Sequence, residues 1–176
     1  MGSLAEASPV AADSLAFRWL ASQDLVQVKA LNDALLQVKY GNTFYRSLLL
    51  EDRTAAVCVD GGGNVVGAAS ARGAQDEAAF ETACAWFTGK RTGYVMTFGV
   101  DARFRRRGIG ERLLQMVMDD LRNRPRCTHI ALHCLVDNVP AIRMYQKQGF
   151  VVHRRLKGHY YFDGRFHDAY HMEALL

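Results

Sequence analysis

The stretch RFRRRGIGERLL, residues 103–114, constrains the fold more than any other part of the chain. It follows the apolar run GYVMTFGV at 93–100, which is typical of a buried strand. Beyond it, apolar side chains recur at the spacing of one helix face, at Ile109, Leu113, Leu114, Val117 and Leu121. The pattern therefore predicts a strand, then a basic turn that contains two glycines, and then a helix.

A turn of this kind is suited to bind an anion. The first four N–H groups of a helix have no acceptor inside the helix, and the aligned peptide dipoles leave about half a positive charge there. Gly108 and Gly110 would let a pyrophosphate approach the backbone, and positive charge would come from Arg103, Arg105, Arg106 and Arg107. The same residues could instead form a solvated surface run or a nuclear-import patch.

The rest of the chain predicts an α/β (α+β) arrangement of seven strands and four helices. We expect strands at 15–21, 54–60, 65–71, 93–100, 129–135, 150–156 and 169–175, and helices at 25–36, from 42 onward, at 109–121 and at 138–148. Ser22 or Asp24 is expected to cap the first helix, and Asp163-Gly164 to turn the last two strands into a hairpin. Residues 73–91 form a long insertion in which a helical turn or two could form, and its role is not defined by the sequence.

Composition indicates one domain and a reducing compartment. A chain of 176 residues, 49% of them hydrophobic, can bury one core, so we expect a single domain over 14–176 after a disordered tail at 1–13. The four cysteines lack C-x-x-C spacing, and the cysteines and histidines together lack metal-ligand spacing, so we expect reduced thiols and no metal. No apolar run approaches the roughly 20 residues of a membrane helix. The net charge of +4 favours anionic partners, and the expected location is the cytoplasm, with no membrane contact.

From Arg105 to Gly110 the turn reads R-x-x-G-x-G, which is neither a Walker loop nor a G-x-G-x-x-G fingerprint. With its flanking strands, with Asn138 seven residues before Tyr145, and with Gly149-Phe150 after them, it resembles the GNAT superfamily of N-acetyltransferases, whose acetyl-CoA pyrophosphate loop reads [QR]-x-x-G-x-[GA]. The segments LQVKYGNTFY, YVMTFGV, LHCLVDNVPAIRMY and HYY look most like N-terminal acetyltransferases of type E and type F. The resemblance implies one GNAT domain over 14–176, with a mixed, mostly antiparallel seven-stranded sheet that is flanked by about four helices and splayed between its fourth and fifth strands.

The resemblance also implies acetyl-CoA as the cosubstrate and assigns residues to it. Cofactor contacts are expected from Phe98, Gly99, Val100, Arg105, Arg106, Arg107, Gly108, Ile109, Gly110, Asn138 and Tyr145. In the family, a tyrosine at the position of Tyr145 lies near the sulfur, where its phenol can hydrogen-bond the leaving thiolate. Tyr94 and His133 match residues that act together as a general base through an ordered water. Imidazole titrates nearer neutrality than phenol does. The pair is therefore expected to be the base, with His133 as the better titrating group and Tyr94 orienting the water.

Leu36, Val38 and Tyr40 resemble the loop that receives the first residue of a peptide, and Met96, Tyr160 and Tyr161 would complete an apolar pocket. Such a pocket suits protein or peptide N-termini that start with Met. With a pKa of about 7.7–8.0, about a tenth to a sixth of an α-amine is neutral at pH 7, against about one lysine in 2500. The sequence departs from the subfamily at Gln37, where a proline is usual, and it carries no type F extension before Leu176, which favours type E.

Other interpretations stay open at this point. Tyr94, His133 and Tyr145 could be structural, and a cysteine thiol could carry the acyl group. The acceptor could be a lysine or a small amine, or the chain could be a weakly active acyl-CoA-binding subunit. An auxiliary subunit and proximity to the ribosome are possible partners. Direct binding of nucleic acid is not expected, because Phe104 is the only aromatic residue within the basic run.

Overall fold

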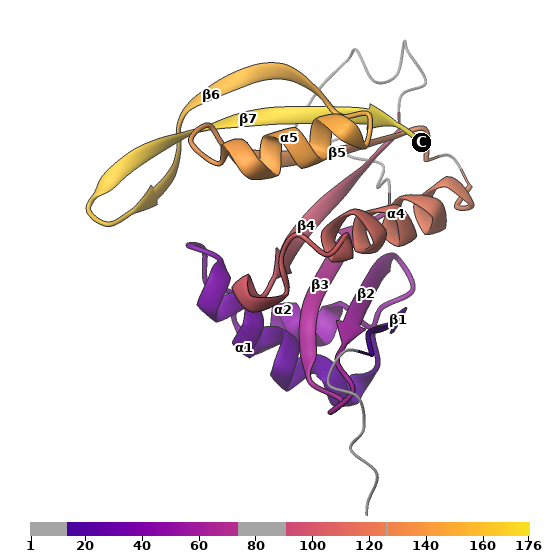
Figure 1. Cartoon of the computed structure of the whole chain (residues 1–176). Helices are drawn as coiled ribbons and strands as arrows, with labels where there is room; N and C mark the ends of the chain where they lie inside the picture. Colours follow the sequence, from indigo (N-terminus) through magenta and orange to yellow (C-terminus); the bar gives the residue numbers. More distant parts are fainter. Residues whose placement is uncertain (1–13, 74–90, 126) are drawn as a thin grey trace, which may run out of the picture.

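The computed structural model describes residues 14–73, 91–125 and 127–176 (Figure 1). Its seven strands form one sheet in the order β1-β2-β3-β4-β5-β7-β6. The strands are β1 Ala16–Trp19, β2 Arg53–Val59, β3 Val65–Arg72, β4 Thr92–Val100, β5 His129–Leu135, β6 Val151–Phe162 and β7 Arg165–Leu175. The helices are α1 Leu25–Leu35, α2 Asn42–Ser47, α4 Ile109–Arg122 and α5 Val139–Lys147, with short 3₁₀ turns at Ser22–Asp24 and Ala102–Phe104. The predicted order of elements is confirmed. The tail at 1–13 and most of the 73–91 insertion lie outside the described residues.

The sheet is covered by helices on both faces. On β2, the side chains of Ala55, Val57 and Val59 pack in a cluster with α1 and α2, whereas those of Ala56 and Cys58 pack in a second cluster with α4. Figure 1 shows α1 and α2 together and α4 apart from them, across β2 and β3. Burial on both faces explains why β2 and β3 are almost continuously apolar and do not alternate.

The sheet opens between β4 and β5, as predicted. These two strands are the parallel pair, and only Thr92, Gly93 and Tyr94 of β4 pair with His129, Ile130 and Ala131 of β5. Both strands then continue without pairing to each other, β4 to Val100 and β5 to Leu135. A backbone edge of β4 is therefore left open beyond Tyr94, beside the opening.

Asp24 stands at the start of α1, as predicted, but its carboxylate does not cap that helix. It accepts a hydrogen bond from the backbone N–H of Ala21 at 2.8 Å and binds the guanidinium of Arg18 at 2.5 and 2.8 Å. The Arg18 hydrogen bond lowers the pKa of the Asp24 carboxyl from its ordinary value. The contact ties β1 to the start of α1.

The β6–β7 hairpin turns at Asp163 and Gly164, whose φ angles of 50° and 72° are those of a two-residue hairpin turn. Between Leu156 and Tyr160 the register shifts: Leu156 faces Ala169, and Tyr160 faces His167. Between these two pairs β6 has two more residues than β7. This bulge changes the direction of the side chains that follow. Figure 1 shows the hairpin extending beyond α5.

Candidate active site

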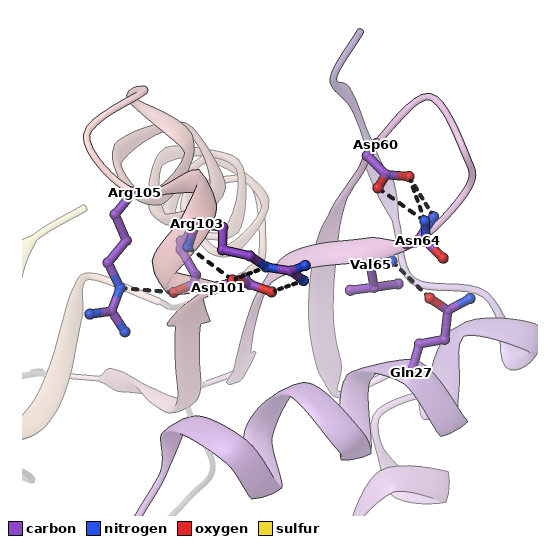
Figure 2. Close-up of polar contacts among 8 residues, drawn as sticks. Gln27, Asp60, Asn64, Val65, Asp101, Arg103 and Arg105 are labelled. Atoms are coloured by element: carbon purple, nitrogen blue, oxygen red, sulfur yellow. Dashed lines mark hydrogen bonds and ion pairs between the residues drawn. The ribbon is translucent and has the colours of Figure 1, made fainter. Parts of the chain in front are cut away.

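The basic turn after β4 is held together by its own side chains. The Asp101 carboxylate accepts from the backbone N–H of Arg103 at 3.0 Å and forms an ion pair with its guanidinium at 2.7 Å, as Figure 2 shows. The Arg105 Nε donates to the backbone carbonyl of Val100 at 3.0 Å (Figure 2). Arg103 therefore stabilises the turn beside a carboxylate, and Arg105 fastens the turn to the end of β4. A carbonyl oxygen has two lone pairs, so Val100 can still accept from a ligand.

Gly108 and Gly110 are each required for a different structural reason. Gly108 has a φ of 74°, in the left-handed region, and a methyl group there would meet nothing within 4 Å. A methyl group at Gly110 would lie 3.0 Å from Cζ of Phe98, so this glycine lets α4 pack against β4. The first backbone hydrogen bond of α4 runs from the N–H of Arg112 to Gly108 O. The N–H groups of Ile109, Gly110 and Glu111 precede that bond and have no acceptor within the helix, as an anion site requires.

A cavity of about 470 Å³ lies at the opening between β4 and β5. Three predicted cofactor residues line it, namely Phe98, Asn138 and Tyr145. Asn138 also caps α5, because its Oδ1 accepts from the N–H of Ala141 at 3.3 Å. Gly99 has no side chain to line the cavity. Its role is to let the Leu35 side chain pack closely against β4, since a methyl group at Gly99 would lie 2.8 Å from Cδ1 of Leu35. Phe98 of β4, the helix-capping residue Asn138 and the phenol of Tyr145 thus border the same cavity.

Tyr145 is 7% exposed, and its ring packs at an angle against Phe98 and Phe150. Burial raises the pKa of its phenol well above the ordinary value, so the hydroxyl stays protonated and can act as a hydrogen-bond donor. Cys134 lines the same cavity, and burial raises the pKa of its thiol to about 11. A thiol with that pKa is protonated near neutral pH, which disfavours a cysteine acyl carrier.

Tyr94 and His133 are brought into direct contact. The Tyr94 hydroxyl lies 2.9 Å from Nδ1 of His133, and His133 lines the cavity. Burial is the main cause that raises the pKa of Tyr94 far above its ordinary value, so its phenol acts as a donor here and not as an anionic base. A hydrogen bond of 2.9 Å leaves no room for a water between the two side chains. The predicted water would have to lie between this pair and the amine, and its participation stays a prediction.

Three further residues of this region were missed from the sequence. Nε2 of His133 lies 3.0 Å from Nδ1 of His171, and Nε2 of His171 lies 2.8 Å from Oε1 of Glu173. The ring of His159, which lies within the bulge of β6, packs edge-on against that of His133 at a centroid distance of 4.3 Å. His171 and Glu173 are two residues apart on a strand and so share a face. That spacing was visible, but the pairing of His171 with His133 becomes apparent only from the register of β5 with β7.

Of the predicted substrate pocket, the structure places five residues around the cavity: Leu36, Val38, Tyr40, Met96 and Tyr160. Tyr161 is not among them. Its side chain is 65% exposed and packs against Phe166, whereas the next residue, Phe162, lines the cavity. Successive side chains on a strand point to opposite faces, so Tyr160 and Tyr161 cannot both face the pocket, and the expectation for Tyr161 is corrected.

The loop at Gln37 is shaped without a proline. Gln37 itself lines the cavity, and the ammonium of Lys39 donates to the backbone carbonyl of Leu36 at 2.7 Å and to that of Asp33. Tyr40 stacks on Phe44 at a centroid distance of 4.2 Å, which anchors the end of the loop to α2. Hydrogen bonds and stacking thus restrain the segment.

Comparison with known proteins agrees with this geometry. Residues 17–150 match the acetyltransferase (GNAT) family. The chain belongs to that family. An N-alpha-acetyltransferase of Sulfurisphaera tokodaii is 33% identical over 153 residues, which cover 87% of this chain and 88% of the relative. N-alpha-acetyltransferase 60 of Xenopus tropicalis is 27% identical over 172 residues, which cover 94% of this chain and 71% of the relative. The predicted resemblance to N-terminal acetyltransferases is confirmed.

Solved GNAT structures share the whole fold. Arabidopsis thaliana NAA60, in complex with a bisubstrate analogue, superposes with a TM-score of 0.81 at 24% identity, over 93% of this chain and 99% of that one, and shows the fold. Arabidopsis thaliana Naa50, in complex with the bisubstrate analogue CoA-Ac-MVNAL, has a TM-score of 0.72 at 27% identity, over 91% and 97%.

Two features are absent from the part of the chain that the structure describes. In residues 14–73, 91–125 and 127–176, no group of three or more His, Cys, Asp or Glu side chains is placed to hold a metal ion. Across the same ranges, no helix has the length and apolar character needed to cross a bilayer.

Proposed function

We propose that this GNAT enzyme transfers the acetyl group of acetyl-CoA to the free α-amine of protein N-termini, with Met as the first residue. The observation that carries the proposal is the convergence on one cavity of the Tyr145 phenol and of His133, which is hydrogen-bonded to Tyr94. The loop at 36–40 borders the same cavity with Leu36, Val38 and Tyr40. The N-alpha-acetyltransferase relatives support the same reaction class.

Acetyl-CoA would bind along the open edge of β4. Its pyrophosphate would accept from the N–H groups at the start of α4, with charge from Arg106 and Arg107, and its pantetheine would pair with the backbone at 98–100. The Nδ2 group of Asn138 would face the pantetheine, because the Oδ1 atom of Asn138 already caps α5. The thioester would then lie near Tyr145.

Attack by the neutral amine on the thioester carbonyl forms the C–N bond and breaks the C–S bond, and the electron pair leaves with sulfur. The Tyr145 phenol would donate a hydrogen bond to the developing thiolate. Because burial raises the pKa of this phenol, it stabilises the thiolate as a donor and does not need to give up its proton. Tyr94 and His133 together would accept the proton that the amine loses.

The walls of the cavity favour an apolar first residue over a polyamine. Among the described residues that line it, Asp137 is the one carboxylate, and the remainder are mostly apolar or tyrosine side chains. Burial raises the pKa of Tyr160 to about 12, so this wall stays uncharged at neutral pH. A polyamine, which carries several positive charges, would need more acidic walls.

The test uses purified protein, acetyl-CoA and two peptide panels, with release of the CoA thiol as the measurement. One panel has free Met-Leu, Met-Lys, Ser and Ala N-termini, and the other has blocked N-termini and an internal lysine. We expect turnover of the free Met peptides, and its loss in His133→Ala. Turnover of the blocked lysine panel alone would replace this proposal with lysine acetylation. Tight acetyl-CoA binding without any turnover would favour a small-amine enzyme or an acyl-CoA-binding subunit. The cytoplasmic location, an auxiliary subunit and ribosome proximity stay predictions.

A further inference from the structure

A row of polar side chains crosses three strands beside the cavity, and His133 is the member of the row that lines the cavity. Tyr94 comes from β4, His133 from β5, and His171 and Glu173 from β7. The successive distances are 2.9 Å from the Tyr94 hydroxyl to His133 Nδ1, 3.0 Å from His133 Nε2 to His171 Nδ1, and 2.8 Å from His171 Nε2 to Glu173 Oε1. Both nitrogens of each ring are therefore used within the row. We call these four residues the relay.

The strand register makes the relay possible. His133 lies directly opposite His171 in the antiparallel β5–β7 pair, and directly opposite side chains are nearest neighbours on one face. Ala131 lies opposite Glu173 on β7 and is also paired with Tyr94 on β4. Its small side chain leaves room for the larger residues on either side.

The carboxylate at the end fixes the direction of every hydrogen bond in the row. We take Glu173 as ionised; an ionised carboxylate only accepts, so Nε2 of His171 carries the proton that it donates to Glu173. Nδ1 of a neutral His171 then accepts, which requires a proton on Nε2 of His133. Nδ1 of a neutral His133 accepts in turn, and the donor is the Tyr94 hydroxyl, whose burial raises its pKa and keeps it protonated.

We propose that His171 and Glu173 are positioning residues for the acetyl transfer: Glu173, acting through His171, holds His133 as the tautomer whose Nδ1 receives the Tyr94 proton. This inference rests on the proposed function. As the amine nitrogen bonds to the acetyl carbon, its proton passes through the predicted water to the Tyr94 oxygen, and the Tyr94 proton passes to Nδ1 of His133. The imidazolium that forms is stabilised through His171 by the Glu173 charge. The proton later leaves to the CoA thiolate or to solvent, so the atoms and charges balance.

Other titratable groups surround the relay, among them Arg154 on β6, which is paired with His171 in the β6–β7 register. Burial lowers the pKa of His159, so the ring against His133 is neutral at pH 7 and adds no competing charge. The Arg72 guanidinium lies 5.6 Å from the centroid of the Tyr94 ring. At the far end, Nε2 of His153 lies 3.6 Å from Oε2 of Glu173, and its side chain is about half exposed. The phenols that act electrostatically on Tyr94 are Tyr40 and Tyr160.

The first experiment reads the tautomers directly and needs no turnover. Two-bond ¹H–¹⁵N spectra of the histidine rings in the full chain distinguish a proton on Nε2 from a proton on Nδ1. We expect neutral His133 and neutral His171 each to carry the proton on Nε2. A proton on Nδ1 of neutral His133 would overturn the proposal. Since the spectrum is independent of substrate, it decides the relay even if the free Met peptides prove not to be substrates.

The second experiment measures kcat against pH for Glu173→Gln, which keeps the size of the side chain and removes its charge. General-base catalysis as a whole contributes about 10² to 10⁴-fold, and Glu173 acts through two rings, so we expect kcat to fall by about 10-fold or more. The acid limb should move to lower pH, because the protonated relay loses the carboxylate that stabilises it. Glu173→Asp should restore part of kcat, and KM for the peptide should hardly change.

The matched control is His129→Gln, a histidine of β5 whose Nδ1 lies 2.8 Å from Thr128 Oγ1 and which does not line the cavity. It should leave kcat and the pH profile unchanged. Melting temperature and acetyl-CoA affinity, measured for all variants, separate misfolding from a change in the proton path. A Glu173→Gln enzyme that is folded and binds acetyl-CoA, and yet has the wild-type kcat and pH profile, would refute the relay.

Discussion

Replacing Gly108 with alanine tests whether the left-handed residue in the basic turn serves the cofactor. A methyl group at this position meets no atom within 4 Å, so the substitution introduces no clash. Its effect comes from the φ of 74°, because the left-handed conformation costs about 1–2 kcal/mol for a residue with a Cβ atom. The magnitude can therefore be worked out without assumptions about packing.

The conformational strain of the Gly108→Ala variant can reduce either the free energy of unfolding or the affinity for acetyl-CoA. If the alanine of the Gly108→Ala variant keeps the left-handed conformation, the free energy of unfolding falls by about 1–2 kcal/mol. If the turn relaxes instead, the backbone N–H groups at the start of α4 no longer converge. Binding of acetyl-CoA must then restore the left-handed conformation, at the same cost of about 1–2 kcal/mol. An increase in Kd has a ceiling of roughly 5- to 30-fold, because about 1.4 kcal/mol is tenfold. The stability loss and the affinity loss should sum to about 1–2 kcal/mol.

Gly63 offers a matched control. It has a φ of 78° and open space around its Cα, and it lies in the turn between β2 and β3, outside the residues that line the cavity. Gly63→Ala should lose a similar amount of stability and no affinity. Urea unfolding and calorimetric titration with acetyl-CoA measure the two losses. Equal acetyl-CoA affinity in wild type and Gly108→Ala, together with unchanged stability, would refute the reasoning that the turn depends on this conformation.

Three further predictions concern single side chains. Tyr145→Phe removes the proposed phenol donor to the sulfur and should lower kcat by about 10- to 1000-fold with little change in KM, as steady-state kinetics with a free Met peptide would measure. An unchanged kcat would assign Tyr145 to packing alone. Cys134→Ala should keep kcat within about threefold of wild type, because a thiol with its pKa raised to about 11 is not a nucleophile near neutral pH. Loss of turnover in a folded Cys134→Ala variant would instead support a mechanism in which this thiol carries the acyl group. Asp24→Asn should lower the free energy of unfolding at pH 7 by about 1.5–3 kcal/mol, because charged hydrogen bonds to Arg18 and Ala21 are lost. Since the folded-state pKa of Asp24 is lowered, its contribution is present above the unfolded value of about 3.9 and is lost as the pH falls through the folded value, so the two proteins should converge in urea melts at acid pH.

The order of elements could be predicted because each segment carries its own local signal. Helical spacing marks α4, the left-handed Gly149 ends α5, and Asp163-Gly164 has the residues that a tight hairpin needs. Asp24 illustrates where local reasoning stops. Its place at the start of α1 followed from sequence, but its partner Arg18 lies on β1, and no capping rule includes a neighbouring strand.

The candidate site divides in the same way. Residues tied to a motif, such as Gly108, Asn138 and Tyr145, could be proposed from the sequence because their positions are counted from the turn or the helix start. Tyr161 was misplaced because the two extra residues of the β6 bulge and the alternation beyond it decide which tyrosine faces the cavity. His171 and Glu173 were missed because their partners come from the register of β5 with β7, which no local pattern encodes.

The opening of the sheet links these observations. β4 and β5 pair only as far as Tyr94 and Ala131, so the cavity begins where the pairing ends. Tyr94 therefore lies at the last paired position, with the open backbone edge of its own strand ahead of it and His133 two residues further along β5. A sheet paired along its full length would satisfy that edge and leave no slot for the cofactor. The proposed base and the proposed cofactor edge are thus adjacent because one structural event, the divergence of two parallel strands, creates both.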